Sequence, residues 1–422
     1  MVGPMTIVDT EPMRGETAAR PSRWLVLVGI GEDGPVGLTE TAKALVRSAE
    51  LVVGGERHLA LVGDLVRGCS LAWPRPMTQA FPEILAHRGR RVVVLASGDP
   101  FHYGVGRMLA AIVAPEEILS LPQPSSFSLG ASRLAWSLPD LTPVTLHGRP
   151  LETIVRHLQP GVRILALSWD ETTPKKLADL LVARGMGDSR LHVLEALGGP
   201  RERIRHVLAR EFAVHDIDPL NLIGLEVVAA PDAAVVPLAP GLDDALFEND
   251  GQLTKREIRA VTLSALAPRQ GELLWDVGLG AGSVAIEWLL RHPAMKAIGI
   301  EERPERAARA ARNAAALGTP DLRIVEGRAP EALKDLPPPD AVFVGGGFSD
   351  DGVFEAVWSA LKPGGRLVVN AVALETEARL FGLHARYGGE LLRLQVSRAE
   401  PVGTMTGWRP AMPVTQWRAR KP

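Results

Sequence analysis

The stretch LLWDVGLGAGSVAIEWLLRH, Leu273–His292, decides the fold of the second half of the chain. It begins with an apolar run that reaches Asp276, continues with glycine at positions 278, 280 and 282, and ends in an apolar segment of helical length. Glycine lets a backbone turn sharply and lie against a ligand, because no Cβ is in the way. The stretch therefore predicts a strand, a ligand-binding loop and a helix whose first N–H groups are free.

An acidic residue ends the next predicted strand, KAIGIEE, at Glu301. A carboxylate at this position can accept hydrogen bonds from the hydroxyls of a ribose. A dinucleotide fingerprint would need a third glycine where this chain has Ser283. The G-x-G-x-G spacing after Asp276 instead favours S-adenosylmethionine. A NAD-dependent oxidoreductase remains the alternative, and a tight turn that binds no ligand is the simplest structural explanation.

Strand-like apolar runs alternate with helical stretches along the whole chain, which predicts an α/β fold with strands covered on both faces. In the first half these runs are Trp24–Gly31, Glu50–Gly55, Arg91–Gly98, Arg163–Ser168 and Asn221–Ala230. In the second half they are Leu273–Gly280, Lys296–Glu302, Leu322–Gly327, Asp340–Gly347 and Arg366–Val372.

A stretch rich in proline, glycine and acidic residues, Ala230–Thr254, interrupts this alternation and predicts a domain boundary near residue 240. We therefore expect a disordered lead over residues 1–21, a first domain over 22–240 and a second over 241–422.

Composition limits the classes of function. The chain has 422 residues, a formal net charge of −2 and one cysteine. No basic field indicates nucleic acid, no apolar run is long enough to span a membrane, and no Cys/His cluster indicates a metal site. We expect a cytoplasmic enzyme that forms homo-oligomers and needs no metal.

The first half carries glycine-rich loops that follow predicted strands, where α/β sheets bind ligands. They are GIGEDGPVGLT (Gly29–Thr39) and LASGDPFHYGVG (Leu95–Gly106), and PSSFSLGASRLAW (Pro124–Trp136) adds hydroxyl side chains before a helix. Together with LHGRP (Leu146–Pro150), these motifs resemble the tetrapyrrole methylase family. Where that family has G-x-G-P-G-D in its first loop, this chain has Gly-Ile-Gly-Glu-Asp-Gly.

The resemblance implies a two-lobed α/β domain that binds S-adenosylmethionine in a folded shape between its lobes. VVGGERHL (Val52–Leu59) is similar to the branch that methylates carbon 5 of a precorrin. The cofactor-binding residues that the resemblance implies are Gly29, Gly31, Ser97, Gly98, Asp99, Pro100, Tyr103, Ser125 and Ser126. Asp99 has a structural alternative as a turn former.

The second half resembles the decarboxylating precorrin methyltransferases that act at carbon 15, with a Rossmann-like class I methyltransferase domain. The motifs that carry this resemblance are QLTKREIRAVTLSAL (Gln252–Leu266), the glycine loop, IVEGRAPEAL (Ile324–Leu333), VFVGGG, LKPGGRLVVN (Leu361–Asn370) and VNAVALET (Val369–Thr376). The cofactor-binding residues implied are Thr254, Gly278, Leu279, Gly280, Ala281, Gly282, Glu301 and Ala329. Thr254 could also cap a helix, since Glu257 follows in capping-box spacing.

Both modules on one chain imply an enzyme of aerobic cobalamin synthesis that methylates two meso carbons of a precorrin and decarboxylates its ring C acetate. The resemblance implies one S-adenosylmethionine site in each domain and no catalytic side chain that we can name. Candidate contacts to the carboxylates of the tetrapyrrole substrate are Arg57, His58, His147, Arg149 and Arg398, each with an ordinary solvated charge as the alternative. A non-catalytic tetrapyrrole-binding protein is the remaining alternative.

Overall fold

The computed structural model describes residues 23–422, and the predicted disordered lead over residues 1–21 lies outside the described residues. The chain divides into two compact units. The first holds residues up to Thr145 together with His192–His206 and Asp216–Gly224, and the second holds Leu146–Leu191, Val207–His215 and Leu225–Pro422. The boundary expected near residue 240 lies inside the second unit, so a division at that point stays a prediction.

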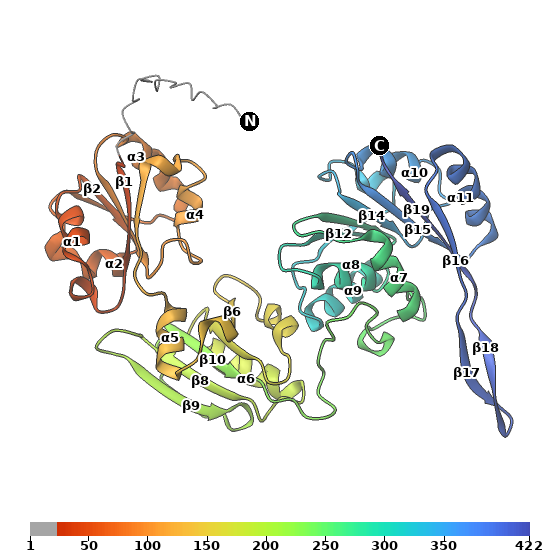
Figure 1. The fold of residues 1–422 in the computed structure, drawn as a ribbon, viewed down its shortest axis with the longest axis horizontal. Coiled ribbons are helices and arrows are strands. Elements are labelled where there is room, and N and C mark those ends of the chain that lie inside the picture. The colour runs from red at the N-terminus through yellow and green to blue at the C-terminus, as the bar shows by residue number, and fades with distance from the viewer. Residues whose placement is uncertain (1–22) are drawn as a thin grey trace, which may run out of the picture. The chain divides into compact units, whose positions relative to one another are not determined.

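The first sheet has the strand order β3-β2-β4-β1-β5, and its strands are parallel. Its strands are β1 (Leu25–Ile30), β2 (Leu51–Gly54), β3 (Cys69–Ala72), β4 (Val92–Ser97) and β5 (Ile118–Leu121). Its helices are α1 (Glu40–Arg47), α2 (Glu56–Leu61), α3 (Phe81–Ala86) and α4 (Gly106–Leu109). Helix α1 packs on one face through Val46, and α3 and α4 pack on the other through Ile84 and Leu109 (Figure 1). Each buried strand is therefore apolar on both sides.

A second five-stranded sheet has the order β6-β7-β10-β8-β9. Its strands are β6 (Leu141–Thr145), β7 (Arg163–Leu167), β8 (Arg190–Glu195), β9 (Arg203–Leu208) and β10 (Asn221–Glu226). The helices of this region are α5 (Ser126–Leu134) and α6 (Thr173–Ala183).

The largest sheet has seven strands in the order β13-β12-β11-β14-β15-β19-β16. Strands β11 (Leu273–Val277), β12 (Lys296–Glu301), β13 (Arg323–Glu326), β14 (Ala341–Val344) and β15 (Arg366–Ala371) are parallel. Strands β19 (Val414–Arg420) and β16 (Glu390–Leu394) add antiparallel pairs at one edge. Because β11 and β14 are neighbours while β12 and β13 lie on the other side of β11, the chain reverses direction across the sheet beside β11. This is the position where open α/β sheets bind ligands.

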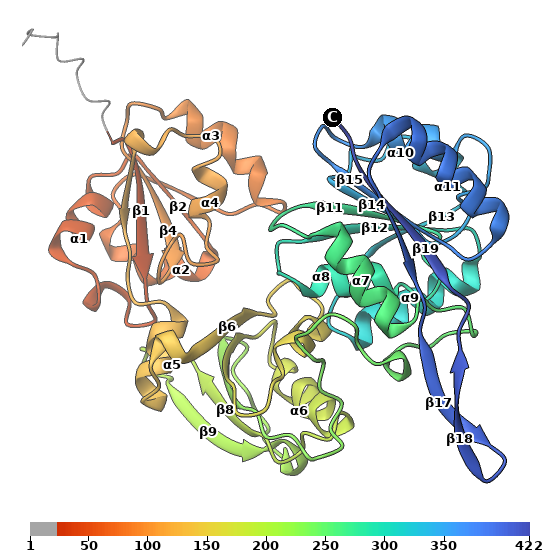
Figure 2. The same cartoon turned by 45° about the vertical axis from the view of Figure 1, so that its right-hand side comes forward.

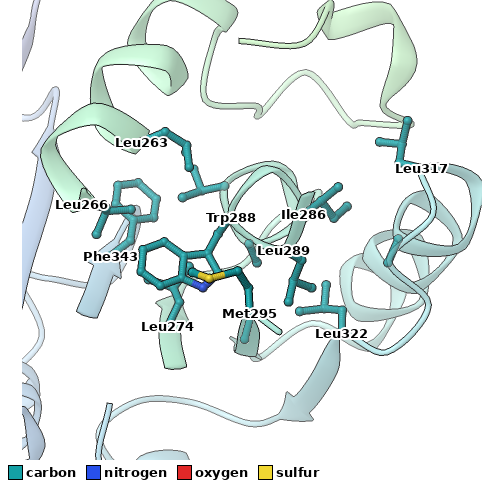
Figure 3. Close-up of a cluster of buried hydrophobic side chains, with 14 of the residues drawn as sticks. Leu263, Leu266, Leu274, Ile286, Trp288, Leu289, Met295, Leu317, Leu322 and Phe343 are labelled. Carbon is teal, nitrogen blue, oxygen red and sulfur yellow. The ribbon is translucent and has the colours of Figure 1, made fainter. Parts of the chain in front are cut away.

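Helices cover both faces of this sheet (Figure 2). They are α7 (Arg256–Leu266), α8 (Ser283–Leu290), α9 (Pro304–Ala316), α10 (Val353–Ala360) and α11 (Leu374–Tyr387). Side chains from α7, β11, α8 and β14 converge on the fully buried Trp288 (Figure 3). On the opposite face, Phe354 of α10 and Leu380 of α11 belong to a second buried cluster.

A long antiparallel hairpin, β17 (Ser397–Val402) and β18 (Met405–Pro410), extends away from the seven-stranded sheet (Figures 1 and 2). Within residues 23–422, no helix is long and apolar enough to cross a membrane. The same described residues contain no group of three or more His, Cys, Asp or Glu side chains that could hold a metal ion.

Candidate functional site

The glycine loop between β11 and α8 has the left-handed backbone that its sequence predicts. Its φ angles are +76° at Gly278, +58° at Gly280 and +79° at Gly282. A Cβ at position 278 would lie 2.9 Å from the backbone nitrogen of Gly346, so a side chain cannot fit there. A Cβ at position 280 would meet no atom nearer than 4.0 Å. The loop thus packs tightly against a neighbouring loop and leaves its tip open.

Glu301 ends β12 beside this loop and is 5% exposed. Its Oε2 accepts a hydrogen bond from the Gly280 N–H at 2.8 Å, and its Oε1 accepts one from the Arg303 N–H at 3.1 Å. Each carboxylate oxygen can accept a further hydrogen bond. The carboxylate is therefore fixed in orientation and still able to bind two hydroxyl groups.

Asp276 lies at the end of β11 and is 1% exposed. Its Oδ2 accepts a hydrogen bond from the Ala285 N–H at 3.0 Å, and its Oδ1 is buried without a partner. Burial, and secondarily the charge of Glu301, raises the pKa of Asp276 well above its ordinary value. Asp276 therefore anchors the loop to the first turn of α8.

A cavity of about 940 Å³ lies over this edge of the sheet. The second-half cofactor residues predicted from the sequence that line it are Thr254, Gly278, Leu279, Gly280, Ala281, Glu301 and Ala329. Gly282 does not line it and instead occupies the N-cap position of α8. Lys255, without a side-chain hydrogen bond, is the N-cap of α7, so the alternative role of Thr254 as the cap is wrong.

Other lining residues were not predicted as site residues. They include Gln252, Gly345, Gly346, Gly347, Ser349, Asp350, Asn370 and Arg306. The Asn370 amide donates to Thr262 Oγ1 at 2.9 Å and accepts from Gln416 Nε2 at 2.9 Å, so a polar network inside the apolar core orients it. The three glycines after β14 belong to the motif VFVGGG, and their position directly after a buried strand is a sequence signal for a binding loop.

The cavity fits S-adenosylmethionine in size and chemistry. Ligand pockets commonly measure about 300–1,000 Å³. The open tip at Gly280 lets a ligand approach the backbone, and Glu301 offers acceptors for ribose hydroxyls.

In the first unit, the end of β1 lies against the loop that follows β4. A Cβ at Gly29 would overlap the carbonyl oxygen of Gly98, and Gly98 has a φ of +55°. Ser97 Oγ lies 3.0 Å from Arg57 Nη2 and 2.9 Å from His58 Nε2. The structure therefore brings five of the predicted residues, from three segments of the chain, to one sheet edge.

His58 is a neutral side chain in this cluster. Burial, and secondarily the charge of Arg57, lowers the pKa of His58 to about 4. Arg57 also forms an ion pair with Glu32, a residue of the first loop where the family pattern has proline. Arg201 pairs with the same carboxylate at 3.5 Å. Glu32 thus holds two guanidinium groups beside the glycine loops.

Two of the first-half candidates have local structural roles. Asp99 Oδ1 accepts a hydrogen bond from the Phe101 N–H at 2.8 Å, as a turn former does. Ser125 Oγ accepts from the Ser128 N–H at 3.2 Å and caps α5, whose first residue is Ser126. Neither role precludes a contact with a ligand.

The remaining candidates are spread over both units. In the first unit, Gly31 and Pro100 lie in the two loops, and Tyr103 has a φ of +57° and is 54% exposed. His147 and Arg149 belong to the second unit, where the His147 ring lies 6.4 Å from that of Trp169. Arg398 lines the 940 Å³ cavity.

Comparison with known proteins agrees with this architecture. Residues 24–213 match the family model described as Tetrapyrrole (Corrin/Porphyrin) Methylases, and residues 245–421 match the model described as Precorrin methyltransferase domain. The α/β class and the order of the two modules are therefore confirmed.

Three curated relatives are similar to the chain. The Precorrin-6Y C(5,15)-methyltransferase [decarboxylating] of Sinorhizobium sp is 57% identical over 94% of this chain and 96% of the relative. The Cobalt-precorrin-7 C(5)-methyltransferase of Salmonella typhimurium is 31% identical over 43% of this chain and 88% of the relative. The Probable cobalt-precorrin-6B C(15)-methyltransferase (decarboxylating) of Saccharolobus solfataricus is 35% identical over 32% of this chain and 72% of the relative. On the strength of both modules and of this near full-length identity, the chain belongs to the family of decarboxylating precorrin-6Y C5,15-methyltransferases.

Proposed function

We propose that the protein is a bifunctional methyltransferase that methylates carbons 5 and 15 of precorrin-6Y and removes the ring C acetate carboxylate as carbon dioxide. Its product would be precorrin-8, an intermediate of aerobic cobalamin synthesis. The observation that carries the proposal is the presence of both family modules on one chain, in an order shared with a full-length relative named for both reactions.

The cofactor proposed is S-adenosylmethionine, with one site in each module. When bound, it supplies a methyl group on a positively charged sulfur that an electron-rich carbon can attack. In the second module, Glu301 would accept hydrogen bonds from the ribose hydroxyls, and the loop at Gly280 would lie against the cofactor without a side chain between them. Enclosure within the cavity would exclude water from the reacting atoms.

The first module would hold the second cofactor at the loops after β1 and β4. Gly29 and Gly98 allow the end of β1 to approach the loop after β4 closely, and Ser97 is fixed by Arg57 and His58. This edge carries no counterpart of Glu301 at the tip of the neighbouring strand β2, which ends at Gly54. Two differently built sites suit two methylations at different positions of the macrocycle.

Decarboxylation would belong to the second module. Carbon 15 lies beside ring C, so one docked orientation can bring both the acetate and the carbon to be methylated near the same cavity. Loss of carbon dioxide leaves an electron pair that the conjugated macrocycle can accept. The role of the protein would then be to orient the substrate and to exclude water.

The test is turnover of precorrin-6Y by the full chain with S-adenosylmethionine labelled in its methyl group. We expect two labelled methyl groups in the product and the loss of one carbon dioxide by mass spectrometry. Binding without turnover would favour a tetrapyrrole-binding protein, and reduction of NAD would favour the oxidoreductase. The homo-oligomeric state and a cytoplasmic location remain predictions for gel filtration with light scattering and for cell fractionation.

A further inference from the structure

The cavity of the second module extends well beyond its cofactor residues. Glu301 and Ala329 follow β12 and β13, which lie on one side of β11 in the sheet. Asn370 and Val372 lie at the end of β15, on the other side, and also line the cavity. If the ribose binds at Glu301, the part of the cavity over β14 and β15 is left for the methyl acceptor.

Apolar side chains form part of the wall of this second region of the cavity. Val372 is 55% exposed and Met412 is 73% exposed, and the half-buried Val396 lies at the base of the β17–β18 hairpin. The Ala411 N–H donates to the Val396 carbonyl at 2.8 Å, which fixes the base of the hairpin. Large apolar side chains left exposed beside a cavity commonly mark a surface that a ligand covers.

A cation borders this apolar wall. Arg398, on β17, lines the cavity with its side chain 45% exposed, and its Nη2 lies 2.5 Å from Glu257 Oε2. Glu257 is itself 46% exposed, and ion pairs between exposed side chains contribute little to stability. A carboxylate on a ligand can therefore replace Glu257 at little cost.

We propose that Val372, Val396, Met412 and Arg398 form the surface on which the tetrapyrrole substrate lies, which we term the macrocycle platform. The platform matches the chemistry of that substrate, because a reduced tetrapyrrole presents a flat apolar face and carboxylates at its edge. The three apolar side chains contact the face, and Arg398 binds one peripheral carboxylate in place of Glu257. This inference rests on the proposed function and assigns its substrate contacts in the second module.

The hairpin offers a matched control. Arg409 is the direct cross-strand partner of Arg398, pairs with Glu400 at 2.8 Å and is not among the residues that line the cavity. The assay follows carbon dioxide release from precorrin-6Y by the full chain. Arg398→Gln should raise the KM for precorrin-6Y about tenfold, as expected for the loss of a charge-assisted hydrogen bond. Arg398→Lys should recover part of this loss, and Arg409→Gln should behave as the wild type.

A second variant tests the apolar face. Met412→Glu places a negative charge on the platform at an exposed position, so folding should be unaffected while the KM for precorrin-6Y rises. Both variants should leave the dissociation constant of S-adenosylmethionine unchanged, measured by calorimetry. The platform would be overturned if Arg398→Gln and Arg409→Gln had the same KM for precorrin-6Y. It would also be overturned if Arg398→Gln weakened S-adenosylmethionine binding by the same factor by which it raised that KM. If the wild type itself releases no carbon dioxide from precorrin-6Y, the proposed function fails instead.

Discussion

Replacement of Glu301 by glutamine tests the cofactor site most directly. The carboxylate accepts two backbone N–H groups, from Gly280 and Arg303, and is 5% exposed. Glutamine has nearly the same shape, but its NH2 group cannot accept a hydrogen bond. That group would face either a backbone N–H or a ribose hydroxyl and could not accept the hydrogen bond that the carboxylate accepts. A hydrogen bond to a charged group contributes about 1.5–3 kcal/mol. The loss of one such bond to the ribose therefore corresponds to about ten- to a hundredfold weaker binding.

Calorimetric titration of the full chain with S-adenosylmethionine measures this effect. We expect Glu301→Gln to weaken one of two binding sites and to leave the other unchanged, because the first module lacks this residue. Glu302→Gln is the control, since the neighbouring carboxylate also lines the cavity but is exposed. Unchanged affinity at both sites in Glu301→Gln would refute the assignment of the ribose contact. Equal weakening by Glu302→Gln would show a general effect of charge.

Three further changes probe stability and the division of labour. Because burial raises the pKa of Asp276 above 3.8, the folded state binds more protons than the unfolded state, so stability should fall as the pH rises above 3.8. Asp276→Asn should reduce this slope in ligand-free thermal melts, and an unchanged slope would contradict a raised pKa for Asp276. Glu287→Gln should lower the free energy of unfolding by about 3–5 kcal/mol in urea titrations, because the fully buried Arg259 loses its fully buried carboxylate partner and keeps only the partly exposed Asp244, at 3.2 Å; a loss below 1 kcal/mol would contradict this. Residues 241–422 alone should melt cooperatively and should both decarboxylate and methylate precorrin-6Y, whereas residues 22–240 should only methylate it. Mass spectrometry of the products measures both reactions. Decarboxylation by residues 22–240 would reverse the assignment.

The sequence predicts the buried parallel strands well, and the reason is burial on both faces. The short parallel strands β3 and β5, whose residues are exposed or half-buried, were missed. The runs around β1, β4 and β11 are almost uninterrupted apolar segments. Strands β1 and β4 match the expected bounds within one residue, whereas β11 ends at Val277, three residues before the expected end at Gly280. The antiparallel strands β16, β17, β18 and β19 were missed as well. Strand β19 is mostly buried, but Thr415 and Gln416 interrupt its apolar run. Strand β9 has an exposed or half-buried side chain at every position, and the hairpin strands β17 and β18 are mostly exposed. Without a buried face, a strand leaves no periodic apolar signal.

The site follows the same logic. The glycine loop and Glu301 were predictable because local geometry determines both: a left-handed turn and a strand end. Asn370 was not predictable, because its orientation depends on Thr262 and Gln416, which come from a distant helix and a distant strand. Long-range polar networks of this kind have no local sequence pattern. The exposed Met412 beside the cavity is likewise visible only once the hairpin is placed.

The segment Ala230–Thr254 shows how composition and structure can diverge. Its prolines and glycines predict a linker, yet the carboxylate of Glu287 accepts hydrogen bonds from the N–H groups of Gly241 at 2.7 Å and Leu242 at 2.8 Å. Arg259, fully buried, neutralises that carboxylate and also donates to the Leu242 carbonyl. The segment then continues to Thr254 in the wall of the cavity. Because an ion pair inside the core holds this stretch, the chain entering the second module is part of its binding site, and loss of the pair should loosen the cavity as well as lower stability.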